Sequence, residues 1–203
     1  MTVKTIIFDL GGVLINWDPR NMYRKIFKDE ERMEYFLANI TTYDWNEQQD
    51  AGRTWAEATR ILVEQHPKWE NEIRAYHARW TEMLDGAIQG TVDILTKLHQ
   101  DKKYRLYALT NWSRETFPYA LENFEFLQYF EGILVSGEEM MKKPDPRIYN
   151  LIAERYNIEK STAVFIDDSL KNVKGSIDTG IYCIHFKSSE QLANDLRALG
   201  VEF

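Results

Sequence analysis

The segment Thr5–Val13 constrains the fold of this chain more than any other stretch. The apolar run Thr5–Phe8 ends in the carboxylate of Asp9, and Gly11 and Gly12 follow. A strand buried on both faces of a parallel sheet needs such a continuous apolar run. An acid at its carboxyl end lies where open α/β sheets bind ligands, and glycines there let the backbone approach a ligand closely. The alternative is a strand followed by a turn that merely begins with Asp. Partners for Asp9 elsewhere in the chain would decide between the two.

Strands and helices alternate in the second half of the chain. The stretches Thr91–Gln100, Pro146–Tyr156 and Ser188–Leu199 carry apolar residues at helical spacing. Between them lie apolar runs that predict further buried strands, namely Arg105–Thr110, Gly132–Ser136, Ala163–Asp167 and Tyr182–His185. This alternation implies parallel crossovers and therefore an α/β fold with a doubly wound sheet.

Residues 16–85 have a different character, because they contain no convincing strand and hold five of the six tryptophans. Their helical stretches are Met22–Phe27, Glu31–Ile40, Thr54–Gln65 and Trp69–Leu84. Seventy residues exceed an ordinary connection, so we expect a helical cap domain at 16–85, inserted into a core of residues 1–15 and 86–203. A long crossover packed on the core is the alternative. We expect hinges at Asn16–Asp18 and Met83–Gly86.

Bulk composition excludes several classes of partner. The net charge of −7 argues against binding to nucleic acid or to an anionic membrane, since both need a basic face. The single cysteine, Cys183, lies in an apolar run, which predicts a buried structural thiol. The N-terminal apolar run is too short for a signal peptide or a membrane span, so a soluble cytoplasmic protein is expected. A monomer and a homodimer are both compatible with the sequence.

Polar side chains follow three of the later predicted strands. Thr110 and Asn111 can hydrogen-bond an anionic oxygen, although such pairs also form turns and helix caps. Lys143, next to a proline, can offer a positive charge to a phosphate, although it also fits a solvated turn. Burying the carboxylates of Asp167 and Asp168 at the end of a strand costs free energy unless a cation or hydrogen-bond donors pair with them. Mg²⁺ prefers such oxygen ligands.

These residues predict one site, because the carboxyl ends of parallel strands meet at one edge of a doubly wound sheet. Phosphoryl transfer to a carboxylate would use this set. Asp9 attacks phosphorus, a metal and Lys143 neutralise the phosphate oxygens, and the Thr110 hydroxyl orients them.

The same segments resemble the haloacid dehalogenase-like hydrolase superfamily, over the whole chain and in the family's order. The matching stretches are Phe8–Val13, Leu109–Asn111, Lys143–Tyr149 and Phe165–Ser169 with Asn172, Val173 and Gly175. The resemblance implies a Rossmann-like core with a helical cap. It also implies a Mg²⁺-dependent phosphatase acting on a small phosphorylated metabolite. The start of the chain and the acid pair look most like a sugar-phosphatase subgroup that includes α-glucose-1-phosphate phosphatase.

Roles for individual residues also follow from this resemblance. Asp9 would be the covalent nucleophile and a metal ligand. The backbone carbonyl of Gly11 and the side chain of Asp168 would complete the protein's metal ligands, with Asp167 in support. Asn111, together with Thr110, would bind the transferred group, and Lys143 would stabilise its charge.

Gly11 departs from the family pattern. Phosphatases of the family usually carry a second Asp at this position, which protonates the leaving oxygen and then activates water. Such a group typically contributes ~10²–10⁴-fold to the rate. Three outcomes stay open: a leaving group that needs little acid help, a substitute acid such as Asp18 or Asp44, or a protein that binds phosphates with little turnover. Asp18 before Pro19 also suits a helix N-cap.

Four residues are candidates for contacts with the body of the substrate. Arg20 and Arg53 can grip an anionic group, and Trp45 and Trp112 can stack on a sugar face. Packing within the cap is the alternative role for the tryptophans.

The sequence therefore supports a phosphatase first, with two alternatives. A 2-haloacid dehalogenase would need no metal, but Asp167 and Asp168 would repel its carboxylate substrate. A phosphate-binding protein that has lost turnover is the other alternative, prompted by Gly11.

Overall fold

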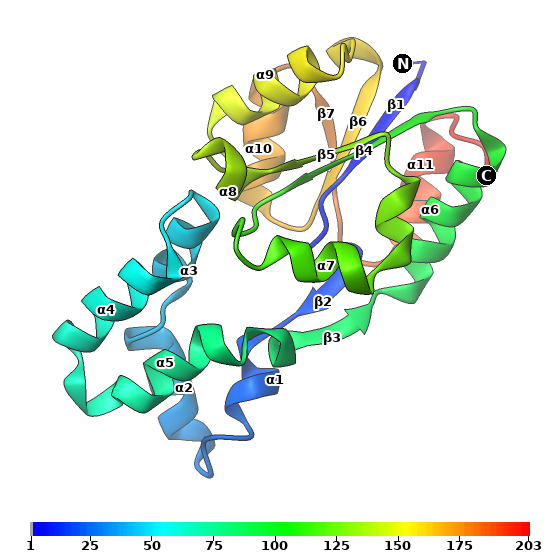
Figure 1. Cartoon of the computed structure of the whole chain (residues 1–203). Helices are drawn as coiled ribbons and strands as arrows, with labels where there is room; N and C mark the ends of the chain where they lie inside the picture. Colours follow the sequence, from blue (N-terminus) through cyan, green and yellow to red (C-terminus); the bar gives the residue numbers. More distant parts are fainter. Residues whose placement is uncertain (1) are drawn as a thin grey trace.

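The fold is organised around one five-stranded parallel sheet (Figure 1). The computed structural model describes residues 2–203, so Met1 of the predicted core lies outside it. The strand order is β5-β4-β1-β6-β7, with β1 in the centre. The strands are β1 (Thr5–Phe8), β4 (Arg105–Thr110), β5 (Gly132–Val135), β6 (Ala163–Asp167) and β7 (Tyr182–His185). All five strands predicted from apolar runs are present, and the predicted doubly wound α/β fold is confirmed.

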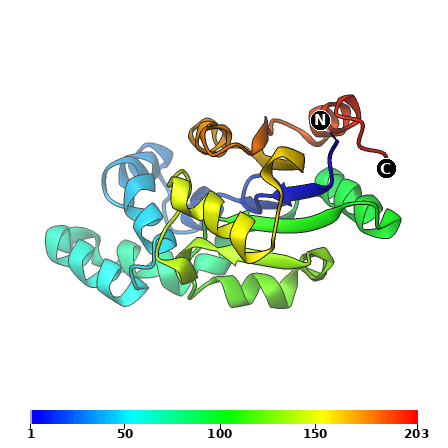
Figure 2. The ribbon, with the colours of Figure 1, turned by 90° about the horizontal axis from the view of Figure 1, so that it is seen from above.

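Helices cover both faces of this sheet (Figure 2). Ile6 of β1 packs in the cluster that includes α6 (Gln89–Asp101) and α11 (Ser189–Ala198), whereas Ile7 packs in the cluster that includes α9 (Pro146–Arg155) and α10 (Leu170–Asp178). This alternation follows from the two-residue period of a strand, and it explains why both faces of β1 are apolar. The remaining helices outside residues 16–85 are α7 (Phe117–Asn123) and α8 (Ser136–Glu139). We call the five-stranded sheet with helices α6 to α11 the sheet domain.

The register of the sheet places the ends of β1 and β6 at the same level. Phe8 pairs with Ile166 of β6 and with Ala108 of β4. The next amide, that of Asp9, donates to the carbonyl of Ile166 at 2.8 Å. Asp9 and Asp167 therefore leave neighbouring strands side by side at the carboxyl edge.

Residues 16–85 form a mainly helical segment beside this carboxyl edge (Figure 1), and we call them the helical segment. Its helices are α1 (Pro19–Tyr23), α2 (Glu30–Asn39), α3 (Tyr43–Asp50), α4 (Trp55–Gln65) and α5 (Glu70–Ala78). Short 3₁₀ turns occur at Pro67–Trp69 and Trp80–Met83 here, and at Glu125–Tyr129 and Lys160–Thr162 elsewhere. One hydrophobic cluster runs from the sheet into this segment, through Phe8, Trp112 and Tyr76. That residues 16–85 form a separate cap domain stays a prediction.

Three local predictions for this segment were wrong. Residues 16–85 were expected to contain no strand, yet two short strands, β2 (Ile15–Trp17) and β3 (Leu84–Ala87), pair as an antiparallel ribbon at the ends of the segment. The hinges expected at Asn16–Asp18 and Met83–Gly86 stay a prediction. The first helix lies earlier than Met22–Phe27, because Asp18 caps it and Pro19 occupies its first turn. Helix α3 was not predicted. Its sequence is mostly polar, yet Asn46, Glu47 and Gln49 are buried, so no apolar period marks it.

Ion pairs fasten α3 to the sheet domain. Glu47 accepts a hydrogen bond from Lys142 Nζ at 2.6 Å and is also paired with Lys171 of α10. Burial alone would raise the pKa of the Glu47 carboxyl, but the two lysines hold it below its usual value. At the end of α3, the Ser136 hydroxyl donates to the carbonyl of Asp50 at 2.5 Å. The helical segment is thus held by contacts in the middle and at the C-terminal end of α3.

The structure also bears on the single cysteine and on membrane-spanning helices. Cys183 is a buried free thiol in β7. Within residues 2–203, no helix combines the length and the apolar character needed to cross a bilayer.

Replacing Glu47 with Gln should loosen α3 from the sheet domain. Hydrogen bonds to charged groups contribute about 1.5–3 kcal/mol, so α3 amides should exchange at least about tenfold faster in hydrogen-exchange mass spectrometry. Glu34→Gln is the matched control, because it breaks an ion pair with Arg20 that lies within the helical segment. Equal exchange at α3 in both variants would contradict the role given to Glu47.

Candidate active site

A buried lysine joins the ends of three elements at the carboxyl edge. The Nζ atom of Lys143 lies 2.8 Å from Asp9 Oδ2 and 2.7 Å from Asp167 Oδ2, and it donates to the carbonyl of Leu109 at 3.0 Å. Lys143 is fully buried, as is Asp167. A buried ammonium requires paired charges around it. The three sequence-predicted residues Asp9, Lys143 and Asp167 therefore form one connected group.

Asn111 fixes the loop that carries this lysine. Its Oδ1 atom accepts from the Lys143 amide at 2.8 Å, and its Nδ2 atom donates to the Lys143 carbonyl at 3.0 Å. Both groups of the amide side chain thus hold the backbone of Lys143, because a primary amide supplies one acceptor and two donors. Asn111 also lines the cavity in front of Asp9.

The acid pair has two different environments. Asp167 is held inside the protein, where its Oδ1 accepts from the Ser169 amide at 2.8 Å and from Asn172 Nδ2 at 3.1 Å. Asp168 instead lines the cavity. Gly12 has a φ of +73°, and a Cβ atom there would collide with the Asp168 carboxylate. The left-handed φ therefore favours glycine at position 12, and a larger residue would displace the Asp168 carboxylate.

Carboxylate oxygens of Asp9, Asp167 and Asp168 all lie within 4.8 Å of one another. Burial raises the pKa of Asp9 well above its usual value, Lys143 opposes this, and the other two carboxylates add to it. Burial and the neighbouring Asp167 likewise raise the pKa of Asp168. The two carboxylates around Lys143 raise its pKa, although burial acts in the opposite direction. One lysine does not balance three carboxylates, so this group is suited to receive a cation.

Thr110 ends β4 with its side chain fully buried. Within residues 2–203, its hydroxyl has no hydrogen-bond partner. Most buried hydroxyl groups are satisfied, so an unpartnered one beside a candidate site calls for a ligand or water.

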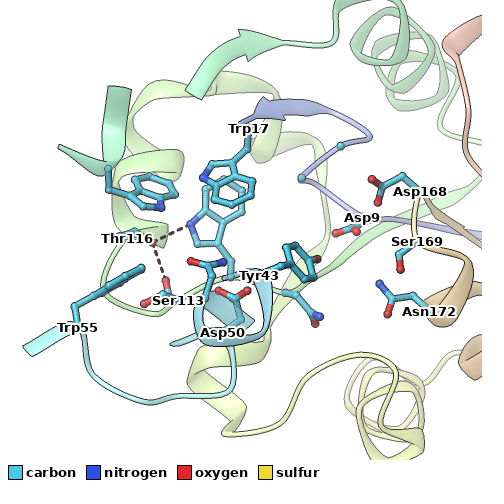
Figure 3. A pocket seen from close by; sticks show the side chains of 16 residues that line it. Asp9, Trp17, Tyr43, Asp50, Trp55, Ser113, Thr116, Asp168, Ser169 and Asn172 are labelled. Atoms are coloured by element: carbon cyan, nitrogen blue, oxygen red, sulfur yellow. Dashed lines mark hydrogen bonds between the residues drawn. The ribbon is translucent and has the colours of Figure 1, made fainter. Parts of the chain in front are cut away.

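A cavity of about 310 Å³ opens in front of Asp9 (Figure 3). In this view Asp9, Asp168, Ser169 and Asn172 lie on one side, and Asp50, Ser113 and Trp55 lie on the other. The wall combines polar groups of the sheet edge with aromatic rings, several of them from the helical segment. It is lined by Asp9, Gly11, Gly12, Trp17, Tyr43, Asn46, Asp50, Trp55, Trp80, Asn111, Trp112, Ser113, Thr116, Asp168, Ser169 and Asn172.

Comparison with known proteins identifies the family. The model of the haloacid dehalogenase-like hydrolases matches residues 3–178, which is most of the chain. The chain belongs to this hydrolase family. The Rossmann-like sheet with an acid after its first strand is therefore the hydrolase scaffold that the sequence motifs resemble.

The chain is similar to several named proteins of known sequence or structure. The sesquiterpene phosphatase astK of Aspergillus oryzae is 28% identical over 199 residues, which cover 98% of this chain and 97% of that protein. The rat N-acylneuraminate-9-phosphatase is 25% identical over 146 residues, 71% of this chain and 55% of that protein. A family enzyme from Bacteroides thetaiotaomicron, bt-2542, has been solved with magnesium and inorganic phosphate. It is 29% identical, with a TM-score of 0.67, over 92% of this chain and 95% of that one.

Three residues predicted to contact substrate lie outside the cavity of the hydrolase. Arg20 pairs with Glu34 at 2.6 Å. Trp45 is buried and packs edge-on against Tyr76. Arg53 donates to Gln49 at 2.7 Å and to the carbonyl of Trp45 at 3.0 Å. These contacts hold the three side chains within the helical segment, and Arg20 lines a second cavity beside it. Their contact with substrate stays a prediction. Trp112 and Gly11, in contrast, line the cavity as expected.

Other cavity residues were not singled out from the sequence. Tyr43 and Asp50 come from the unpredicted helix α3, Trp17 is the last residue of β2, and Trp80 begins the 3₁₀ turn before β3. The concentration of tryptophans in residues 16–85 is the signal for Trp17 and Trp80, and no pattern in the sequence marks Tyr43 or Asp50. Asp18 and Asp44, the acids considered as substitutes for a side chain at Gly11, do not line the cavity. Asp18 caps α1 by accepting from the Arg20 amide at 2.9 Å.

Lys143→Met should destabilise the hydrolase strongly. Removing one partner of a buried ion group leaves uncompensated charge and typically costs about 3–5 kcal/mol. Urea unfolding at pH 7 measures this loss. Lys174→Met, at an exposed position on α10, should change stability by less than about 0.5 kcal/mol.

Adding Asp9→Asn and Asp167→Asn to Lys143→Met should recover part of the lost stability, since the orphaned charges disappear. A Lys143→Met variant as stable as Lys174→Met would contradict the buried ion group.

Proposed function

We propose that this hydrolase is a Mg²⁺-dependent phosphatase that acts on a small phosphorylated metabolite through an aspartyl-phosphate on Asp9. The observation that carries the proposal is the buried group of Lys143 with Asp9 and Asp167, set beside Asp168 at the floor of a cavity. It offers a nucleophile, a fixed positive charge and oxygen ligands for a cation in one place.

The named relatives support the proposal. The two curated relatives are both phosphatases, and the bacterial family enzyme binds magnesium and inorganic phosphate. Their substrates differ, so the chemistry is shared more widely than the specificity.

The residues present fit a magnesium ion. The oxygens of Asp9 and Asp168, together with the Gly11 carbonyl, would hold it, and Asp167 would orient the set from behind. Burial raises the pKa of Asp9 and that of Asp168, and Lys143 offsets this only in part, so a bound cation would favour the charged form of both carboxyl groups. When bound, the ion would neutralise charge on the phosphoryl oxygens.

The chain's own residues would perform the remaining tasks. Lys143 favours the charged form of the Asp9 carboxyl and orients it, and its positive charge faces the transferred group. The free hydroxyl of Thr110 supplies a hydrogen bond to that group, and the carboxylate of Asp9 attacks phosphorus. The indoles of Trp17, Trp80 and Trp112 would contact the substrate body, by stacking on a sugar ring or by apolar contact. A sugar phosphate, as in α-glucose-1-phosphate phosphatase, is the narrower form of this proposal.

The site disfavours the two alternatives. A 2-haloacid dehalogenase must bind a carboxylate substrate, and three carboxylates around one lysine repel it unless a cation is present. A phosphate-binding protein without turnover would have no need of a nucleophile held against a buried lysine.

Phosphate release from a panel of sugar, isoprenoid and nucleoside phosphates tests the proposed function. Release should require Mg²⁺ and disappear with chelator. Asp9→Asn should lower it by about 10⁴-fold or more, because the nucleophile is lost. Asp168→Asn should raise the Mg²⁺ concentration needed for half-maximal activity at least about tenfold. Asp44→Asn is the control and should behave as the wild type.

Halide release from 2-haloacids without metal, with no phosphate release, would favour the dehalogenase. The absence of any turnover would favour a binding role.

A further inference from the structure

Hydrolysis of a phosphate ester of an alcohol needs a proton donor at the leaving oxygen, and position 11 has no side chain to supply one. In-line displacement places the leaving oxygen on the far side of phosphorus from the attacking Asp9. The donor must therefore belong to the part of the cavity wall that faces Asp9 across the cavity. This part of the wall includes α3 of the helical segment.

Four cavity-lining side chains can carry a titrating proton, namely Asp9, Asp168, Tyr43 and Asp50. Asp9 and Asp168 belong to the nucleophile and metal group. Tyr43 is exposed at 59%, and a phenol has an ordinary pKa of about 10, so it keeps its proton too firmly to act as an acid near neutral pH. Asp50 is the acid that remains, and Figure 3 shows it across the cavity from Asp9, beyond the ring of Tyr43.

We propose that Asp50 is the general acid and base of the hydrolysis, an assignment that rests on the proposed phosphatase function. In the first step, Asp9 bonds to phosphorus, the bond from phosphorus to the leaving oxygen breaks, and Asp50 gives its proton to that oxygen to form the alcohol. In the second step, a water oxygen bonds to phosphorus and Asp50 takes a proton from it. The bond from phosphorus to Asp9 breaks, and inorganic phosphate and the Asp9 carboxylate are restored.

The position of Asp50 suits this role. It is the last residue of α3, and its carbonyl is fixed to the sheet domain by the Ser136 hydroxyl at 2.5 Å. Within residues 2–203, no cation lies at ion-pair distance from its carboxylate. The nearby Lys142 is paired with Glu47, and Lys143 with Asp9 and Asp167. A carboxyl group that faces a cavity without a salt bridge is free to exchange a proton with a ligand.

The surroundings of Asp50 also bring its pKa close to neutral pH. Burial and the charge of Glu47 raise the pKa of Asp50 to about 7, while Lys142 and Lys143 act in the opposite direction. A general acid is most effective when its pKa lies near the ambient pH. The groups that interact with Asp50 are Glu47 and Tyr43 on its own helix, Tyr76 on α5, Lys142 and Lys143 on the loop before α9, and the backbone of Ser113.

Dependence on the leaving group separates this role from substrate binding. p-Nitrophenol is a much stronger acid than an alcohol, so its anion leaves without a proton. In single-turnover experiments, Asp50→Asn should slow release from an alkyl phosphate by about 10²–10⁴-fold and leave p-nitrophenol release within about threefold of wild type. The retained p-nitrophenol release shows that the variant is folded and that Asp9 still reacts.

The second step supplies an independent readout. With p-nitrophenyl phosphate in excess, Asp50→Asn should show a burst of one p-nitrophenol per site followed by slow turnover, because the phosphorylated Asp9 lacks a base to activate water. With the alkyl phosphate, kcat/KM of the wild type should decline above neutral pH as Asp50 loses its proton, and kcat/KM of Asp50→Asn should show no such decline.

Asp44→Asn on the same helix and Asp18→Asn at the start of α1 are the matched controls, and both should retain the wild-type leaving-group dependence. Equal slowing of alkyl and p-nitrophenyl phosphates by Asp50→Asn would overturn the assignment and leave Asp50 a binding residue. Unchanged rates with both would overturn it as well. Loss of the proposed function itself would look different, since the wild type would then release no phosphate that depends on Asp9.

Discussion

The buried ammonium of Lys143 is the interaction on which the rest of the structure depends. An isolated charge in a protein interior costs far more than a domain's net stability, so Lys143 is tolerable only where Asp9 and Asp167 meet it. That requirement fixes the register of β1 against β6, because both carboxylates must leave their strands at the same level. It also explains the amide of Asn111, whose side chain holds the backbone of Lys143 instead of facing solvent.

The charge balance of this group links stability to function. The pKa of Lys143 is raised in the folded protein, so its pairing contributes stability that is fully present below its unfolded pKa, which includes neutral pH. The pKa of Asp9 and that of Asp168 are also raised, and for these carboxyls the folded state loses stability as the pH rises through their folded pKa values. A bound cation would relieve this cost, so ligand binding and folding stability should act together.

The sequence predicted the sheet and its catalytic edge because both leave strong local signals. Runs such as Thr5–Phe8 are buried on both faces and end in polar residues whose chemistry is unusual for a strand end. The sequence carries no such signal for the part of the cavity wall that lies opposite Asp9. Helix α3 buries polar side chains, and Asp50 is one acid among many in an acidic chain, so only tertiary contacts distinguish it from Asp44. The ribbon of β2 and β3 was missed because strands of three and four residues rest on their mutual pairing.

Helix α3 connects closure of the helical segment to the chemistry of the site. Glu47 and Asp50 are three residues apart, so they lie on one side of the helix. Glu47 is held by Lys142 and Lys171 of the sheet domain, and Asp50 faces the cavity. The contacts that seat α3 on the sheet therefore also set the distance of Asp50 from Asp9. Under the assignment of Asp50 as proton donor, an unseated helical segment would leave Asp9 without its acid. The phosphoryl group would then be transferred efficiently only inside the closed cavity, where water is restricted to the molecule that the second step needs.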